Sequence, residues 1–354
     1  MEVCFVVGRN GAGKSQYLID QAKGNNKDSS LYICNTVHDR SQELKNSKRF
    51  SVKNTGSHPN NVMKSVIKKM MKEGTHRLHQ IEKILLYCGY SPHITVTMRA
   101  GKTDSRLDDF SETPYIKKLT KMIDSYFNGA DTISFDINFG ETSNFTNLSK
   151  LENLLHQEKP LRHYGMVKTI EIALHKNNNE AVPLLNASSG ELSLMTSLIF
   201  VLGEISGTNM ILIDEPENSL HPRWQREYTS MLCSLIEYHE IKILIATHSP
   251  LIVTGAQLDE RVSSSIYHPA TGKLEFSSST NIEELLWGQF ETITPKSRFL
   301  SEKLAEKLEE LSSQKVSFSE AIEFIDSASK ASFDDDQKDF FIAARKLAEN
   351  ITRG

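Results

Sequence analysis

The stretch GRNGAGKS, residues 8–15, decides the fold class of this sequence. It fits the pattern G-x-x-x-x-G-K-[ST], with Gly8, Gly13, Lys14 and Ser15 at the fixed positions and a further glycine at Gly11. The run before it, MEVCFVV, is short and apolar like a buried strand, and the run after it, SQYLIDQAKG, has apolar residues at helical spacing. A strand, a glycine loop and a helix are the context in which this pattern binds phosphate; an ordinary glycine turn is the alternative.

A nucleotide site follows from this loop. Backbone N–H groups at the start of a helix have no partner within the helix and bind anions. Lys14 is then expected to reach the β- and γ-phosphates, and the Ser15 hydroxyl is expected to bind Mg²⁺. The predicted nucleotide contacts in this part of the chain are Gly8, Asn10, Gly11, Ala12, Gly13, Lys14, Ser15 and Gln16.

Length and composition limit the class of protein. A chain of 354 residues can form one large core or two smaller ones. No apolar run approaches the roughly 18 residues of a membrane span, so we expect no membrane contact. Residues 1–7 resemble a core strand and not a signal peptide, which predicts a cytoplasmic protein. The four cysteines are scattered without a CxxC pair, which favours buried thiols over a disulfide or a zinc site.

Charge is unevenly distributed, although the formal net charge is only −4. Residues 40–130 carry 17 Lys and Arg against 8 Asp and Glu, whereas residues 255–354 carry 12 against 18. The basic stretch could be an electrostatic footprint for nucleic acid. The alternative is a solvated lysine-rich helix, VMKSVIKKMMKEG, because no aromatic residues interleave with its lysines.

A second informative stretch, NMILIDEPENSLHP, covers residues 209–222. Its apolar run predicts a buried strand that ends in Asp214 and Glu215. Ligands bind at the carboxyl ends of parallel strands. Asp214 is therefore expected to hold Mg²⁺, and Glu215 to orient and deprotonate the attacking water.

Two further stretches are ambiguous when taken alone. Ser188, Ser189, Gly190 and Glu191 open a long apolar helix, and this is either a second anion site or simply a good helix N-cap. IKILIATHSP (241–250) predicts a strand followed by His248, which either senses the γ-phosphate or is structural. The order and spacing of the stretches favour the functional interpretation of both.

Together the four stretches closely resemble the ATP-binding-cassette (ABC) ATPases, in particular their soluble branch. That branch holds chromosome-maintenance and recombination-repair ATPases and the overcoming-lysogenization-defect family. The motif DEPENSLHP followed by THSP looks most like the sequences of the stand-alone ATPases of antiphage systems, such as Septu, PARIS and retron-associated modules. The resemblance implies an α/β P-loop fold of the ABC type, with a mixed sheet, a helical insertion and a C-terminal helical segment.

The resemblance also assigns roles to residues. It places the signature loop at Ser188, Ser189, Gly190 and Glu191, which would complete the nucleotide site of a second subunit. It makes Lys14, Glu215 and His248 the catalytic residues and Ser15 and Asp214 the metal ligands. The loop that couples the two sites falls on 217–221, and from it Asn218 and Ser219 are predicted nucleotide contacts. The implied cofactors are ATP and Mg²⁺; adenine is implied by the resemblance alone. The glutamine that links the metal to the helical arm has only two weak candidates, Gln80 and Gln157.

The expected organisation is an ATPase head over 1–290, with an insertion at about 36–180, and a C-terminal helical segment over 291–354 that could dock a partner. Residues 93–99 and 132–140 alternate like strands, and 263–276 predicts a closing hairpin. DDDQKD (334–339) favours an acidic helix start over a metal site. The remaining chain after His248 shows no nuclease pattern, so ATP hydrolysis is the only chemistry expected.

The sequence therefore predicts an ATP-hydrolysing subunit that forms a homodimer or a higher even-numbered oligomer. It would control an effector protein, a nuclease or a toxin, encoded nearby in a defence module. The main alternative is a DNA-repair or recombination ATPase that clamps DNA through the basic 40–130 stretch. A switch that retains ATP without hydrolysis and a transporter subunit are further alternatives.

Overall fold

The computed structural model describes residues 1–25, 30–36, 43–44, 47–51, 58–73, 78–101, 113–140, 145–276, 281–294, 297–332 and 335–353. The elements of the described chain are, in order, β1 (Glu2–Val6), α1 (Lys14–Gly24), β2 (Ser30–Cys34), β3 (Lys48–Ser51), α2 (Pro59–Glu73), α3 (Leu78–Tyr87), β4 (Tyr90–Ala100), α4 (Pro114–Phe127), β5 (Thr132–Asn138), α5 (Phe145–His156), α6 (Glu158–His163), β6 (Val167–Lys176), β7 (Ala181–Pro183), the 3-10 turn η5 (Leu184–Asn186), α7 (Ser189–Glu204), β8 (Met210–Asp214), α8 (Pro222–Leu235), β9 (Lys242–Ala246), α9 (Pro250–Gln257), β10 (Ser263–His268), β11 (Lys273–Glu275), α10 (Ile282–Gly288), α11 (Arg298–Ser312), α12 (Phe318–Lys330) and α13 (Asp335–Arg353).

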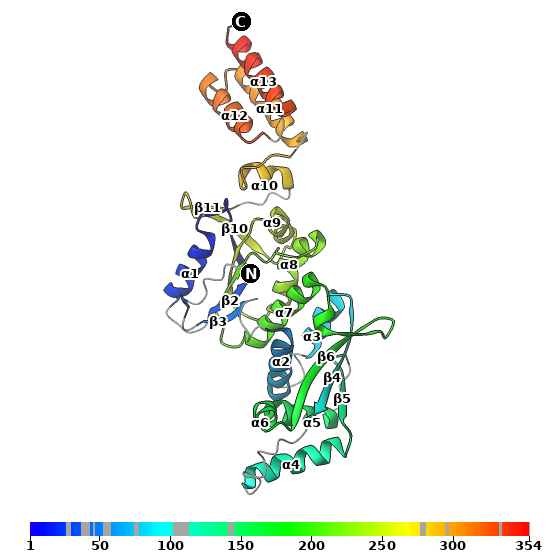
Figure 1. Ribbon diagram of the computed structural model, residues 1–354. Helices are drawn as coiled ribbons and strands as arrows, with labels where there is room; N and C mark the ends of the chain where they lie inside the picture. Colours follow the sequence, from blue (N-terminus) through cyan, green and yellow to red (C-terminus); the bar gives the residue numbers. More distant parts are fainter. Residues whose placement is uncertain are drawn as a thin grey trace.

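The centre of the molecule is a seven-stranded sheet with the order β11-β10-β1-β9-β8-β2-β3 (Figure 1). Its strands run parallel from β10 to β3, and β11 is antiparallel to β10. Because parallel strands share one direction, the loops that follow β1, β8 and β9 emerge at the same edge of the sheet. GRNGAGKS follows β1, Glu215 follows β8 and His248 follows β9. This topology therefore brings together three stretches, of which the first and the last are more than 200 residues apart in the sequence.

The central strands are buried on both faces, which accounts for their continuous apolar sequences. Along β8, Ile211 and Ile213 belong to the larger hydrophobic cluster, whereas Leu212 belongs to a smaller one with Leu18 and Ile19 of α1. Helix α1 therefore covers one face of the sheet, and helices α7, α8 and α9 cover the other (Figure 1). The α/β fold with a mixed sheet is confirmed.

A second sheet, β5-β4-β6-β7, is antiparallel throughout and carries helices α3 to α6 beside it. The strands expected at 93–99 and 132–140 are β4 and β5, so both predictions are confirmed. Inside the expected insertion, residues 48–51 add β3 to the seven-stranded sheet. The division of the chain into head, insertion and C-terminal segment stays a prediction.

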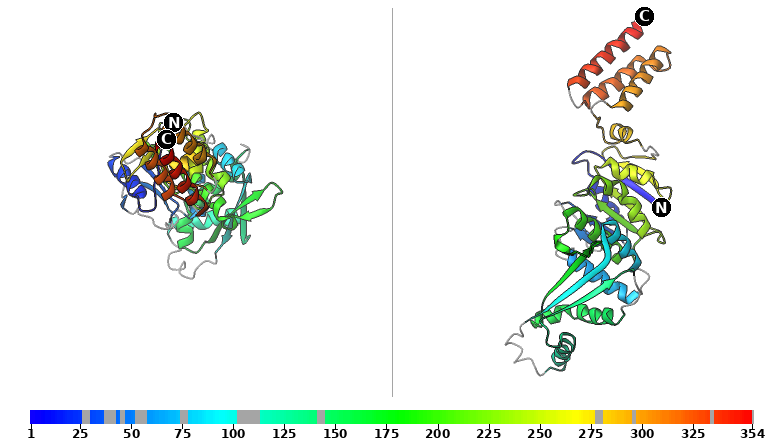
Figure 2. Two further views of the ribbon diagram at one scale, coloured as in Figure 1. Left: turned by 90° about the horizontal axis from the view of Figure 1, so that it is seen from above. Right: turned by 90° about the vertical axis from the view of Figure 1, so that its right-hand side faces the viewer.

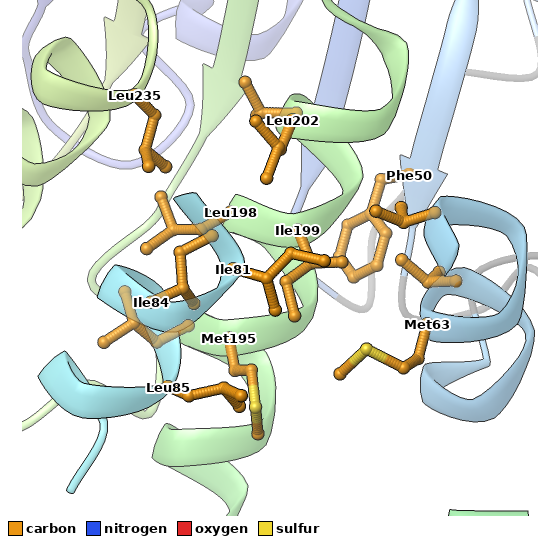
Figure 3. Packing of buried hydrophobic residues seen from close by; sticks show 14 of the residues in the cluster. Phe50, Met63, Ile81, Ile84, Leu85, Met195, Leu198, Ile199, Leu202 and Leu235 are labelled. Carbon is orange, nitrogen blue, oxygen red and sulfur yellow. The ribbon is translucent and has the colours of Figure 1, made fainter. Parts of the chain in front are cut away.

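Helix α7 connects the two sheets. It is nearly apolar all round, and nine of its sixteen residues are buried. Figure 3 shows its side chains Met195, Leu198 and Ile199 packed between Ile81 and Ile84 of α3 and, on the other side, Phe50 and Met63. A helix that is hydrophobic all round has to be surrounded by protein, and here α2, α3 and the sheet provide that cover. The signature stretch therefore begins a helix whose position is fixed by both sheets.

The expected hairpin is formed by β10 and β11, so that prediction is confirmed. The C-terminal segment is helical, as expected, and contains α11, α12 and α13. These helices have a hydrophobic cluster of their own, separate from the two clusters around the sheet. They lie at one end of an elongated molecule, and α4 lies at the other end (Figures 1 and 2). Of the acidic run 334–339, Asp334 lies outside the described residues, and α13 begins at Asp335.

Candidate nucleotide-binding and hydrolysis site

The loop between β1 and α1 has the backbone that the sequence pattern predicts. Gly8, Gly11 and Gly13 all have positive φ, at 146°, 80° and 88°. A Cβ on Gly8 would lie 3.1 Å from the Ala12 Cβ, so the loop is also tight. Gly13 is the N-cap of α1 and provides no side-chain hydrogen bond to the helix. The first N–H groups of α1 thus lack a side-chain cap, which leaves them available to phosphate oxygens.

Lys14 folds back over this loop. Its Nζ donates hydrogen bonds to the carbonyl oxygens of Gly8 (2.9 Å) and Arg9 (3.2 Å), and the residue is 6% exposed. Burial lowers the pKa of the ammonium, and the carboxylates of Glu215 and Asp214 partly oppose that effect. The ammonium is therefore already held at the loop where phosphates would bind.

Asp214, the last residue of β8, is almost completely buried at 1% exposure. Its Oδ2 accepts a hydrogen bond from the Tyr32 hydroxyl at 3.1 Å, and the Ser15 side chain lies close enough to favour the charged carboxylate. Its Oδ1 is buried without a hydrogen-bond partner. Burial raises the pKa of Asp214 to about 6, against the opposing effects of Ser15 and Tyr32. A buried carboxylate with one unused oxygen beside a serine hydroxyl fits a Mg²⁺ site, because oxygen ligands suit this ion.

Glu215 and His248 face each other across the ends of β8 and β9. Their closest oxygen and nitrogen, Oε1 and Nε2, are 3.6 Å apart. The Asn218 amide donates to the other carboxylate oxygen of Glu215 at 3.0 Å. Burial and the nearby Lys14 charge lower the pKa of His248, against the opposing effect of Glu215. The imidazole is therefore neutral near pH 7.

The backbone of Glu215 has φ of 51°, which is uncommon outside glycine. Its N–H donates to the Ala246 carbonyl at 2.9 Å, so the residue is tied to the end of β9. A residue held in such a conformation by surrounding hydrogen bonds is typical of functional sites. The side chain is thereby aimed away from the direction that a continuing strand would give it.

The loop after Glu215 holds His248 in place. The Glu217 Oε1 accepts the His248 backbone N–H at 2.5 Å, while its Oε2 is buried without a partner. Burial raises the pKa of this carboxyl group. Gln225 accepts from the Ser249 hydroxyl at 2.7 Å and donates to the Leu220 carbonyl at 2.9 Å. The loop after β8 and the loop after β9 are consequently one hydrogen-bonded unit.

The signature stretch forms a separate cluster. Ser188 is the N-cap of α7 and makes a reciprocal capping box with Glu191. The Tyr90 hydroxyl donates to the same Glu191 carboxylate at 2.9 Å. A Cβ on Gly190 would lie 2.5 Å from the Ser219 carbonyl oxygen, so α7 begins directly against the loop after Glu215. The helix N-cap that the sequence offered as an alternative is therefore formed, and it lies beside the loop that follows Glu215.

The structure brings together Lys14, Ser15, Asp214, Glu215 and His248, with Asn218 attached through Glu215. In the described part of the chain, the hydrogen bonds of Ser188–Glu191 do not reach the phosphate loop. The remaining predicted contacts lie at the margins: Asn10 is exposed in the loop, the Gln16 amide donates to Asp20, and Ser219 has φ of 68°. The two weak glutamine candidates bond elsewhere, Gln80 to the Leu235 carbonyl and Gln157 to the Tyr115 hydroxyl.

Two tyrosines, Tyr32 at the nucleotide site and Tyr90 at the signature stretch, are missing from the sequence-based predictions. Tyr32 stands in the otherwise apolar strand SLYIC, and Tyr90 precedes the strand at 93–99. A buried tyrosine hydroxyl needs a partner, so a tyrosine in a fully buried strand was a usable signal for a neighbouring carboxylate. Its partner could not be inferred, because Tyr32 and Asp214 are 182 residues apart.

Parts of this chain are similar to known proteins. Residues 89–254 match the family model described as "AAA domain, putative AbiEii toxin, Type IV TA system". The chain is 42% identical to the OLD nuclease of Thermus scotoductus over 50 residues, which are 14% of this chain and 9% of that protein. It is 32% identical to protein ea59 of Escherichia phage lambda over 124 residues, 34% and 22% of the respective chains. It is 25% identical to the "Retron Vc95 probable ATPase" of Vibrio cholerae over 138 residues, 32% and 26% of the respective chains.

The chain thus spans about a quarter or less of the length of these curated relatives. The matches support an ATPase related to the OLD family and to defence-associated ATPases, as the sequence predicts. Assignment to a particular defence system stays a prediction. In the described residues, no helix is both long enough and apolar enough to cross a membrane.

Proposed function

We propose that this chain is an ABC-type ATPase that works as a head-to-tail dimer and controls an effector, a nuclease or a toxin, in a bacterial antiphage defence system. One observation carries the ATPase part: Lys14, Asp214, Glu215 and His248 converge at one edge of the sheet, and a buried Asp214 oxygen is left without a partner. The names of two relatives, an OLD nuclease and a retron ATPase, support the defence context.

In this proposal Glu215 takes the proton of the attacking water. Asn218 fixes one oxygen of that carboxylate, and the other oxygen faces His248. His248, neutral near pH 7, forms a hydrogen bond with the same water or with the γ-phosphate. Lys14 leaves the Gly8 and Arg9 carbonyls for the phosphates. Mg²⁺, held by Ser15 and Asp214, would neutralise charge on the β- and γ-phosphates.

The ATPase assignment is tested by phosphate release from purified protein with ATP and Mg²⁺, comparing wild type with Lys14→Ala. Glu240→Ala, which removes an exposed charge outside the site, is the matched control. Loss of turnover in Lys14→Ala with a normal control supports the proposal. Equal turnover in wild type and Lys14→Ala contradicts it.

The dimer arrangement has a sharper test by subunit mixing. Lys14→Ala leaves the signature stretch intact, whereas Ser189→Glu leaves the phosphate loop intact and places a negative charge at an exposed position. Each variant alone is expected to be inactive. If the site is shared between subunits, an equal mixture regains about a quarter of wild-type turnover, because half the dimers carry one complete site of two. A mixture that stays inactive, in a preparation shown to exchange subunits, contradicts the shared site.

Control of an effector is tested by native mass spectrometry of the protein isolated from its host. A second polypeptide in stoichiometric amount supports this part of the proposal. A homodimer without a second polypeptide contradicts it and favours the DNA-repair or recombination ATPase.

The lysine-rich helix bears on that second candidate. In α2, Lys64 pairs with Glu158 at 2.5 Å, and Lys69 pairs with Glu204. Burial lowers the pKa of Lys68. Lys64 and Lys69 are therefore paired within the chain, so α2 offers less charge to a nucleic acid than its sequence indicates. A DNA clamp would need other cationic groups.

A further inference from the structure

A basic cavity lies at the end of the antiparallel sheet, away from the nucleotide site. Its volume is about 980 Å³, and its charged lining residues are Arg99, Arg162, Lys168 and Asp131. They come from four different segments: the end of β4, α6, the start of β6 and the turn before β5. The lining therefore carries three cations against one carboxylate. None of these residues belongs to the nucleotide site described above.

The walls of the cavity are built by a close backbone contact. A Cβ on Gly101 would lie 1.8 Å from the Gly165 carbonyl oxygen, and the Gly101 N–H donates to the Met166 carbonyl at 3.0 Å. This contact pins the end of β4 against the turn between α6 and β6. Only a glycine permits so close an approach. The backbone positions of Arg99, Arg162 and Lys168 are therefore held by regular elements that this contact joins.

The three cations differ in whether they already have an ion-pair partner. Arg162 shares the Glu158 carboxylate, with Nε 3.3 Å from Oε1, and that carboxylate also binds Lys64. Arg99 and Lys168 are exposed, and neither has an ion-pair partner among the residues that the structure describes. Two unpaired cations and one partly paired guanidinium around a cavity attract anions, because Asp131 is the one carboxylate in the described lining against three cations.

The positive charge continues onto the neighbouring helix. α4 leads through Asn128–Asp131 into the cavity lining, and its exposed face carries Lys117, Lys118 and Lys121. Within the described residues these three lysines have no ion-pair partner either. Figures 1 and 2 show α4 at the tip of the molecule opposite the C-terminal helices. The cavity is consequently one part of an extended basic end of the molecule, which we call the basic tip (Arg99, Arg162, Lys168 and the three α4 lysines).

We propose that the basic tip binds the phosphate backbone of double-stranded nucleic acid, with Arg99 and Lys168 as its principal contacts. The charge is spread over a helix and a cavity, which suits a repeating polyanion better than a single small phosphate. The described lining of the cavity contains no aromatic ring, so it offers no stacking platform for the bases of a single strand. Arginine and lysine contacts to phosphates position a duplex without reading its sequence.

The site is also connected to the signature stretch. β4 runs from Tyr90, which bonds Glu191, to Arg99 and Ala100 at the cavity. An eleven-residue strand covers roughly 35 Å. A ligand at the basic tip thus contacts the strand that holds the start of α7.

The test measures binding of a fluorescein-labelled duplex, about two helical turns long, to the full chain by fluorescence anisotropy without ATP. The variant is Arg99→Ala/Lys168→Ala. The control, Lys273→Ala/Lys315→Ala, removes the same charge from exposed residues far along the chain. We expect the variant to bind about tenfold or more weakly, and the slope of log K against log salt concentration to become shallower by about 1.8 for two lost phosphate contacts. The control is expected to keep the wild-type slope.

A charge reversal, Lys168→Glu, provides a second variant and is expected to weaken binding further than Lys168→Ala. Unchanged affinity and slope in Arg99→Ala/Lys168→Ala overturn the proposal, and so does an equal loss in the control. Tighter binding of the single strand than of the duplex also overturns it. Because the assay contains no ATP, its failure leaves the proposed ATPase untouched.

Discussion

The Tyr90 hydroxyl donates a 2.9 Å hydrogen bond to the Glu191 carboxylate, which joins the first residue of β4 to the first turn of α7. The same carboxylate accepts the Ser188 backbone N–H. Burial and the hydrogen bond to Glu191 raise the pKa of Tyr90, so the hydroxyl keeps its proton near neutral pH. The antiparallel sheet thereby holds the start of the helix that the signature stretch opens.

Tyr90→Phe removes this bond and keeps the ring. A hydrogen bond to a charged group contributes about 1.5–3 kcal/mol, so we expect a lower free energy of unfolding by roughly that amount. We also expect slower ATP turnover with little change in ATP affinity, because the phosphate loop is untouched. The measurements are chemical unfolding, nucleotide titration and phosphate release. Tyr115→Phe, which removes an exposed tyrosine hydroxyl, is the control.

If the basic tip binds a duplex, the same variant separates binding from its effect on turnover. Tyr90→Phe is expected to bind the labelled duplex like wild type, yet to lose any change in ATP turnover that the duplex causes. A duplex effect on turnover that persists in Tyr90→Phe would show that β4 does not transmit it.

Glu215→Gln is expected to bind ATP but to release phosphate at least about 100-fold more slowly, the usual effect of losing a general base. It should also trap the closed dimer when ATP is present, which size-exclusion chromatography would detect. Glu240→Gln serves as the isosteric control at an exposed position. Wild-type turnover in Glu215→Gln would remove this residue from the proposed role.

We expect Asp214 to make both the free energy of unfolding and the ATP turnover depend on pH. Its pKa is raised to about 6 from 3.8, so between these values the folded chain retains a proton that the unfolded chain releases. The free energy of unfolding therefore falls as pH rises through this window. The full loss of stability, which comes from ionising the buried carboxyl, is reached above pH ~6. Turnover should fall as pH drops below ~6, because a protonated carboxyl is a poor Mg²⁺ ligand.

Asp214→Asn removes that cost. Without nucleotide, we expect the variant to be more stable than wild type at about pH 7.5, by at most about 3 kcal/mol, with the difference vanishing below about pH 4. Adding ATP and Mg²⁺ should raise the Tm of wild type but scarcely that of the variant. Thermal unfolding across pH measures both effects, with Asp124→Asn at an exposed position as the control. A variant less stable than wild type at every pH would contradict the burial argument.

Gly190→Ala tests the contact between the start of α7 and the catalytic loop. The new methyl group would lie 2.5 Å from the Ser219 carbonyl oxygen, a backbone atom that cannot rotate away. We expect a loss of about 1–3 kcal/mol of stability from overpacking, together with reduced turnover. Gly24→Ala, at a position where the methyl group meets no atom within 4 Å, should leave both unchanged. Equal behaviour of the two variants would show that the contact has no consequence.

The sequence predicted the strands, loops and helices of the site better than the contacts between them. GRNGAGKS between an apolar strand and an amphipathic helix specified the phosphate loop, because positive φ at Gly8, Gly11 and Gly13 is a local requirement. The apolar runs before Asp214 and His248 likewise predicted two central strands. The Septu or PARIS assignment, the dimer and the effector are not decided by such local patterns and stay predictions.

The basic 40–130 stretch shows what a count of charges misses. Its lysine-rich helix, α2, has lysines that pair with Glu158 and Glu204, both far outside the stretch. The exposed cations of the basic tip include Lys168, which also lies outside it. Whether a lysine is free or paired depends on which distant carboxylate the fold places beside it.

The sequence by itself determined the phosphate loop, the two central strands that lead to Glu215 and His248, and the hydrophobic helix α7, since local backbone preferences and apolar periodicity are carried by neighbouring residues. Only the tertiary structure decided that Tyr32 holds Asp214, that Glu217 holds His248 and that Tyr90 holds Glu191. It also decided which cations stay exposed at the basic tip. The physical reason is that buried polar groups need partners, and the partner of each is chosen by strand order in the sheets, across separations of 31 to 182 residues for these three hydrogen bonds.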